Sequence, residues 1–123
     1  MAQEIGPLEV ARGLEFMDLL AYIYLQHGLP DKAAVLLVAR DLLGPVDARA
    51  LLTLALAQVR SAKPAKALQT LERLALLGAM GAEFHLVRAQ ALQALQRQEE
   101  ALSAMRAYAA MQPLSSPASA PST

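Results

Sequence analysis

The histidines and one acidic pair are the side chains of this sequence best suited to chemistry, and neither group is placed to perform it. His27 and His85 are the only histidines, and no Cys, Asp or Glu accompanies them at metal-ligand spacing. We therefore expect packing or surface histidines. Glu99 and Glu100 stand in the first turn of an expected helix, where negative charge favours the helix dipole. The sequence also lacks cysteine, a glycine-rich phosphate loop and a nucleophile elbow, so it predicts no enzyme, no metal and no cofactor.

The elements that carry these residues repeat along the chain with a fixed period. Two series of alanines keep the same even spacing: Ala33, Ala67 and Ala101, and Ala21, Ala55 and Ala89. Pro30 and Pro64 also stand one period apart. No insertion interrupts the register, and the spacing matches the ~34 residues of a tetratricopeptide repeat.

This period predicts an all-α fold of three tandem tetratricopeptide repeats, whose six antiparallel helices form a short right-handed solenoid with a concave groove. Alanine is expected where two paired helices approach closely, because a larger side chain would push them apart. Larger residues are expected to fill the space between the helices: Leu20, Tyr24, Leu37, Leu54, Leu71, Leu92, Met105 and Tyr108.

Turn and capping signals divide the chain into three repeats, 14–47, 48–81 and 82–112, between two end segments. Residues 1–13 are an N-terminal arm or the early part of the first helix, and we favour a helix start near Pro7. Gly28 is expected to end the first helix, Asp47 to cap the third, and Pro64 to stand in the first turn of the fourth. Residues 113–123, rich in Pro and Ser, predict a disordered tail. The expected helices are 14–26, 30–43, 48–60, 64–77, 82–95 and 98–111.

Charge and hydropathy exclude several classes of partner. The 11 basic and 11 acidic residues balance, so no net field recruits nucleic acid or an anionic membrane. Outside the C-terminal segment, the longest uncharged run is Leu19–Pro30, which is shorter than the ~20 residues of a membrane span, and Met1–Arg12 has no signal-peptide pattern. We therefore expect a cytoplasmic protein with no membrane insertion. The apolar fraction is 55%, above the usual ~45–50%, which leaves apolar side chains to place at the surface.

We expect the excess to line the concave groove of the solenoid, where apolar residues recur on the first helix of each repeat. An exposed strip of this kind marks an interaction site, and it suits an amphipathic helix or an extended peptide. The alternative is that some of these leucines pack within the core. The candidate partner-binding residues are Tyr22, Leu25, Leu52, Leu56, Val59, Leu86 and Gln90, with Asp18, Arg49 and Arg60 at the groove edge.

The groove also lacks the residues that would clamp a carboxylate. Repeat domains that hold the C-terminal tail of heat-shock chaperones need Lys, Asn and Arg together. This chain has no Asn and offers only Arg49 and Arg60 at the groove. Such a client is therefore not expected.

Two segments resemble the Y-type (SctY) family of small chaperones of bacterial type III secretion systems. The first runs from Leu25 to Leu37, LQHGLPDKAAVLL. The second includes Arg88-Ala89-Gln90, Glu100-Ala101 and Tyr108, and the resemblance covers about residues 14–111.

The resemblance implies a cytoplasmic protein that binds and shields SctX, a small hydrophobic secreted component, and presents it to the export gate SctV at the inner membrane. It also implies that the chain self-associates without its client. Two neighbouring families, which protect the needle subunit or the translocators, remain alternatives. A general tetratricopeptide scaffold or adaptor remains the other.

Overall fold

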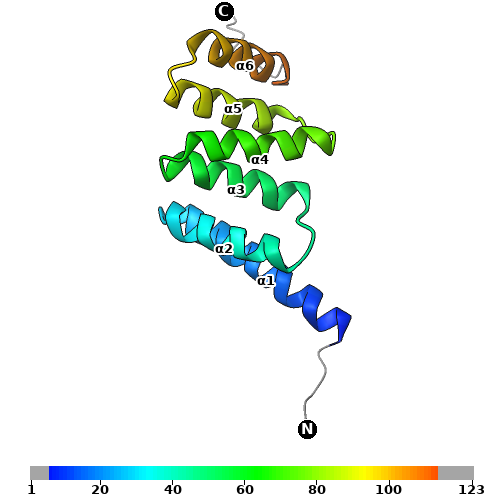
Figure 1. The fold of residues 1–123 in the computed structure, drawn as a ribbon. Coiled ribbons are helices and arrows are strands. Elements are labelled where there is room, and N and C mark those ends of the chain that lie inside the picture. Colours follow the sequence, from blue (N-terminus) through cyan, green and yellow to red (C-terminus); the bar gives the residue numbers. More distant parts are fainter. Residues whose placement is uncertain (1–5, 114–123) are drawn as a thin grey trace, which may run out of the picture.

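The computed structural model describes residues 6–113, which form six α-helices and no strand (Figure 1). Helix α1 begins at Pro7, the early start that the sequence favoured, and every other boundary lies within a residue of its expected place. The expected tail lies outside the described residues except for Pro113. The helices are α1 (Pro7–Gln26), α2 (Pro30–Leu43), α3 (Ala48–Arg60), α4 (Pro64–Leu76), α5 (Ala82–Ala94) and α6 (Gln98–Ala110).

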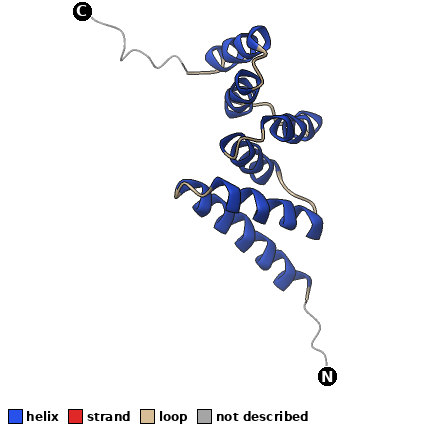
Figure 2. Cartoon of the chain, turned by 60° about the vertical axis from the view of Figure 1, so that its left-hand side comes forward, coloured by secondary structure: helices blue, strands red, loops and turns tan. Residues whose placement is uncertain are grey.

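The helices follow one another in a stack that keeps the order of the chain (Figure 1). Short turns join α1 to α2, α3 to α4 and α5 to α6, and the members of each pair pack together. The second helix of a pair also packs on the first helix of the next, and α3 contacts both α1 and α5. Figure 2 views α3 to α6 nearly end-on while α1 and α2 run across the picture, so the first pair is inclined to the others.

The backbone itself repeats with the period of the sequence. Helices α2, α4 and α6 start at Pro30, Pro64 and Gln98, and α3 and α5 start at Ala48 and Ala82. Each pair turns on a residue in the left-handed region, with φ of 73°, 60° and 61° at Gly28, Ala62 and Gln96. The amide that follows donates to the carbonyl five residues earlier, as in a Schellman motif. These bonds are Leu29 to Tyr24, Lys63 to Gln58 and Arg97 to Leu92.

The local signals read from the sequence act as expected. Gly28 ends α1, and Pro64 is the first residue of α4. The Asp47 side chain caps α3 by accepting a hydrogen bond of 2.8 Å from the Ala50 amide. All six periodic alanines are buried, which confirms that small residues occupy the close approaches between helices.

The large residues expected to fill the space between the helices differ in how deeply they are buried. Leu37, Leu54, Leu71 and Leu92 are buried. Leu20, Tyr24 and Tyr108 are half-buried. Met105 is 42% exposed, so its assignment to the interior was wrong. Its counterparts in α2 and α4 are covered by the next pair of helices, whereas no described helix follows α6.

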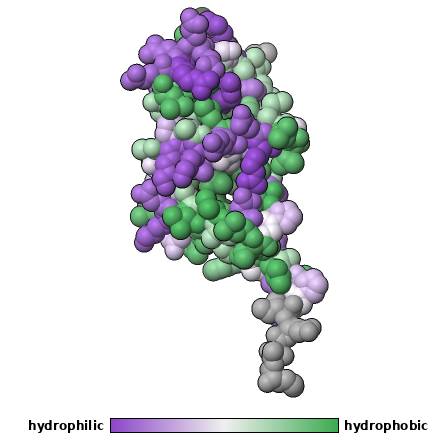
Figure 3. Space-filling model, in the orientation of Figure 1, coloured by the Kyte–Doolittle hydropathy of each residue, from purple (hydrophilic) through white to green (hydrophobic). Residues whose placement is uncertain are grey.

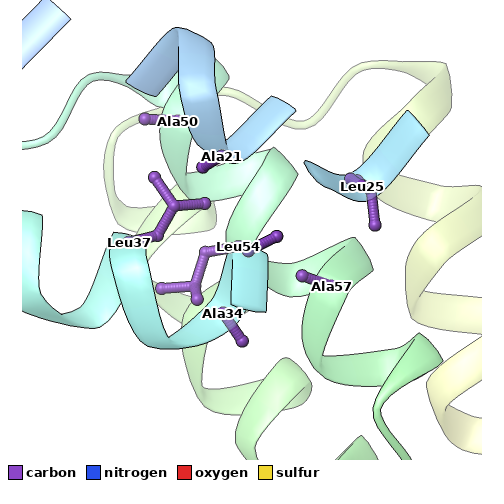
Figure 4. Close-up of a cluster of buried hydrophobic side chains, with 8 residues drawn as sticks. Ala21, Leu25, Ala34, Leu37, Ala50, Leu54 and Ala57 are labelled. Atoms are coloured by element: carbon purple, nitrogen blue, oxygen red, sulfur yellow. The ribbon is translucent and has the colours of Figure 1, made fainter. Parts of the chain in front are cut away.

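The first buried cluster joins three helices and is drawn in Figure 4. Its members come from α1, α2 and α3: Ala21, Leu25, Ala33, Ala34, Leu37, Ala50, Leu54 and Ala57. Alanines form most of this list, so the three backbones lie close together. None of the helices within residues 6–113 has both the length and the hydropathy needed to cross a membrane.

Candidate binding groove

A groove of about 900 Å³ runs over α1, α3 and α5, the first helices of the three pairs. Its wall on α1 is one helical face, because four lining residues stand at i, i+3, i+4 and i+7. These are Glu15, Asp18, Leu19 and Tyr22. The first turns of α3 and α5 and the end of α4 supply most of the remainder: Asp47, Ala48, Arg49, Ala50, Leu52, Thr53, Leu74, Ala79, Gly81, Ala82, Glu83 and Phe84.

Four of the candidate residues meet in this groove. Tyr22 and Leu52 contribute apolar surface, and Asp18 and Arg49 contribute charge. Tyr22 is 48% exposed and its hydroxyl accepts a hydrogen bond of 3.0 Å from the side-chain Nε2 of Gln26. The structure therefore brings Tyr22 and Leu52 together from helices of two different pairs.

Leu25 is a correction to the expected groove. It is only 5% exposed and belongs to the core cluster with Ala57 of α3 (Figure 4). It stands one helical turn after Ala21, on the buried face of α1, so its side chain contributes to folding and not to a surface.

The remaining candidates do not line this groove. Leu56 and Val59 are half-buried and pack against the core clusters, and Leu86 is half-buried as well. Arg60 and Gln90 are exposed. All five stand further along their helices than the lining residues of α3 and α5. The expected continuous strip is thus interrupted, partly by the core packing that was its alternative.

Sequence reasoning missed three large apolar residues that line the groove. Leu19, on α1, is 56% exposed and lies one turn before Tyr22, a spacing that could have identified it. Leu74 and Phe84 are largely buried and reach the groove from α4 and α5. Their contribution depends on how the helix pairs stack, which no local pattern records.

Asp18, on the α1 wall of the groove, forms an ion pair with Arg40 of α2. Arg40 Nε donates to Asp18 Oδ1 at 3.1 Å, and Arg40 Nη1 donates to the carbonyls of Gly44 and Pro45 at 3.1 and 2.9 Å. One buried guanidinium thus ties α1 to the connection between α2 and α3. Burial raises the pKa of the Asp18 carboxyl above its usual value, and the opposing effect of Arg40 is smaller. The charges of Asp47 and Glu15 also raise this pKa.

The histidines lie apart from the groove. His85 is half-buried, and its ring meets Phe84 edge-on with centroids 5.1 Å apart, so it packs within the fold. His27 is exposed at the end of α1. Between residues 6 and 113, no three His, Cys, Asp or Glu side chains gather as a metal-binding group would.

The groove therefore offers an apolar surface of leucine and aromatic side chains with charged groups around it, which suits a peptide or a helix. No protein-family model matches the chain, and no curated protein matches it either.

Proposed function

We propose that the chain forms three tetratricopeptide repeats in a right-handed solenoid and acts as a Y-type chaperone of type III secretion. The periodic recurrence of helix starts and left-handed turns supports the repeat assignment. In this proposal the client is a small hydrophobic secreted protein of the SctX class, which the chaperone shields in the bacterial cytoplasm and presents to the export gate SctV.

The groove over α1, α3 and α5 carries the proposal. Leu19 and Tyr22 are about half exposed on its α1 wall, and Leu52 faces them from α3. Apolar side chains on a client segment would gain roughly 25 cal/mol for each Å² buried there, less the cost of ordering that segment. An aggregation-prone client would be protected by the same contact.

Co-expression of the chain with an SctX-class protein tests the proposal. We expect a stable complex on size-exclusion chromatography with light scattering. Changing Tyr22 to Glu should weaken the complex roughly 30-fold, because a client then buries a charge at an aromatic anchor position. Tyr22 is 48% exposed, so the variant should keep the helicity of the wild type by circular dichroism.

Leu76→Glu is the matched control. Leu76 is 88% exposed near the end of α4 and does not line the groove, so this variant should bind the client as the wild type does. If Tyr22→Glu binds the client as tightly as the wild type does, the client does not bind in the groove. Failure to bind an SctX-class protein, with retention of a needle subunit or a translocator, would assign the chain to a neighbouring chaperone family.

A further inference from the structure

Helix α1 presents an apolar stripe to solvent. Phe16 is 63% exposed, Leu19 is 56% exposed and Ile23 is 39% exposed, and their spacing of i, i+3 and i+7 places them on one face. Most of the exposed large hydrophobic residues lie, like these, between Leu8 and Leu43. Figure 3 shows hydrophobic side chains gathered over the α1 and α2 end and hydrophilic ones at the α6 end.

The residues one and two periods later show which positions of α3 and α5 correspond to this stripe. Adding one period gives Ala50, Thr53 and Ala57 of α3, and adding two gives Phe84, Val87 and Ala91 of α5. All of these are buried except Thr53, which is half-buried. In α3 and α5 this face receives the second helix of the preceding pair, α2 or α4. The chain has no such helix before α1 within the described residues.

The last helix has the complementary surface. Leu102 and Met105 of α6 are 56% and 42% exposed. One period earlier stand Leu68 and Leu71 of α4, which line a small pocket together with Phe84 of α5. Two periods earlier stand Ala34 and Leu37 of α2, which pack with Ala50 and Ala57 of α3 (Figure 4).

We infer that α6 of one molecule packs on α1 of a second copy, head to tail, and so continues the stack of helices across the molecular boundary. In the repeat register this contact would correspond to the interface between α4 and α5. Leu102 takes the place of Leu68, Met105 that of Leu71, and Phe16 that of Phe84, a phenylalanine in both cases. This interface goes beyond the proposed function, because Phe16, Leu102 and Met105 do not line the groove, and Leu19 is the residue of the stripe that does.

The geometry of this contact sets its strength and its stoichiometry. One helix face on another buries less than the interfaces of stable dimers, so the association should be weak and depend on concentration. A head-to-tail contact uses two different surfaces, so it does not close with two copies unless the rotation between them forms a ring. The wild type should therefore form a series of oligomers.

Sedimentation velocity and light scattering of the full chain, over about 10 μM to 1 mM, test the inference. The wild-type mass should rise with concentration above the 13.1 kDa of one chain. Phe16→Glu and Leu102→Glu should each weaken association at least tenfold and sediment as monomers. Each variant keeps one intact end, so an equal mixture of the two should form a 1:1 dimer and nothing larger.

The outcomes distinguish three cases: α6 of a second copy packs on the α1 stripe, α1 of a second copy packs on it, or the chain does not associate. A wild type that stays monomeric throughout would overturn the inference. Persistent association of Leu102→Glu would instead place α1 against α1 of the second copy and contradict the head-to-tail arrangement, as would a mixture that fails to dimerise. Leu76→Glu removes a leucine that is even more exposed and lies away from both ends of the stack, and it should associate as the wild type does. Both test residues are more than half exposed, so circular dichroism should show unchanged helicity in each variant.

Discussion

At the scale of single residues, the polar contacts inside the fold are few and specific. Gln58 of α3 and Thr70 of α4 are both buried, and the Thr70 hydroxyl donates to Gln58 Oε1 at 2.6 Å. No buried side-chain nitrogen or oxygen among the described residues lacks a partner. Because an unpaired polar group inside a protein is costly, this bond fixes how α3 and α4 face each other.

Replacing Thr70 by Val should destabilise the protein by about 1–3 kcal/mol, because the shape is kept while the Gln58 oxygen loses its buried donor. Urea unfolding followed by circular dichroism measures the change. The double variant Thr70→Val with Gln58→Leu should recover much of the loss, since no polar atom then remains unpaired. A Thr70→Val protein as stable as the wild type would show that water reaches Gln58.

At the scale of elements, the connections within the pairs are alike in backbone but differ in residue type. Gly28, Ala62 and Gln96 all have positive φ, yet only glycine adopts this region without strain. A Cβ at Gly28 would meet nothing within 4 Å, so the positive φ, and not crowding, is what disfavours a side chain at this position. The second and third turns therefore carry a conformational cost that the first avoids.

Ala62→Gly should stabilise the protein by about 0.5–1 kcal/mol, because it relieves the left-handed backbone strain of a residue with a Cβ. Gly28→Ala, the matched reverse change one period earlier, should destabilise it by a similar amount. Thermal and urea unfolding of both variants give the comparison. A loss of stability in Ala62→Gly would mean that the flexibility of glycine in the unfolded chain outweighs the relief of strain.

At the scale of the whole molecule, an ion pair links the second helices of neighbouring pairs. Arg73 of α4 donates to both carboxylate oxygens of Asp41 of α2, at 2.7 and 3.0 Å. These hydrogen bonds are the main reason that the pKa of Asp41 lies below its usual 3.8. The side chain of Arg73 is 47% exposed, so solvent screens the pair and limits its contribution.

This pair should stabilise the stack only while Asp41 is ionised. Because the pKa is lower in the folded state, the stabilisation is complete above the unfolded value and is lost as the pH falls through the folded one. Asp41→Asn should therefore cost less than about 1 kcal/mol at pH 7, and the difference from the wild type should shrink as the pH falls below 3.8 and vanish below the folded pKa of Asp41. Urea unfolding of both proteins at each pH gives this difference. If the difference in unfolding free energy between the two proteins persists in acid, the loss of stability comes from packing and not from the ion pair.

The Asp18 pair behaves in the opposite sense. Burial raises the pKa of Asp18, so its ionisation favours the unfolded chain, and its contribution to stability falls as the pH rises through the folded pKa. The dependence of the protein's stability on acidic pH is the sum of the Asp41 and Asp18 contributions. Comparison of the wild type with Asp41→Asn isolates the contribution of the ion pair between α2 and α4.

The limits of the helices and their period follow from patterns in the sequence. Gly28, Asp47 and Pro64 are local signals, and each acts through neighbours a few residues away, while alanines at a fixed spacing give the period. Local signals are sufficient for helix limits, because the hydrogen bonds of a helix join residues four apart. The places where helices approach closely were also predictable, since only small side chains fit there.

Which apolar side chains are covered depends on how the helices pack against one another. Leu25 and Tyr22 stand three residues apart on α1, yet Leu25 packs beneath α3 while Tyr22 opens into the groove. Phe16 and Phe84 occupy equivalent positions, yet one is exposed and the other buried, because a helix precedes α5 and no described helix precedes α1. A side chain is buried only where another helix packs on it. Equivalent residues of a repeated sequence look alike, so the sequence does not show which of them a neighbouring helix covers.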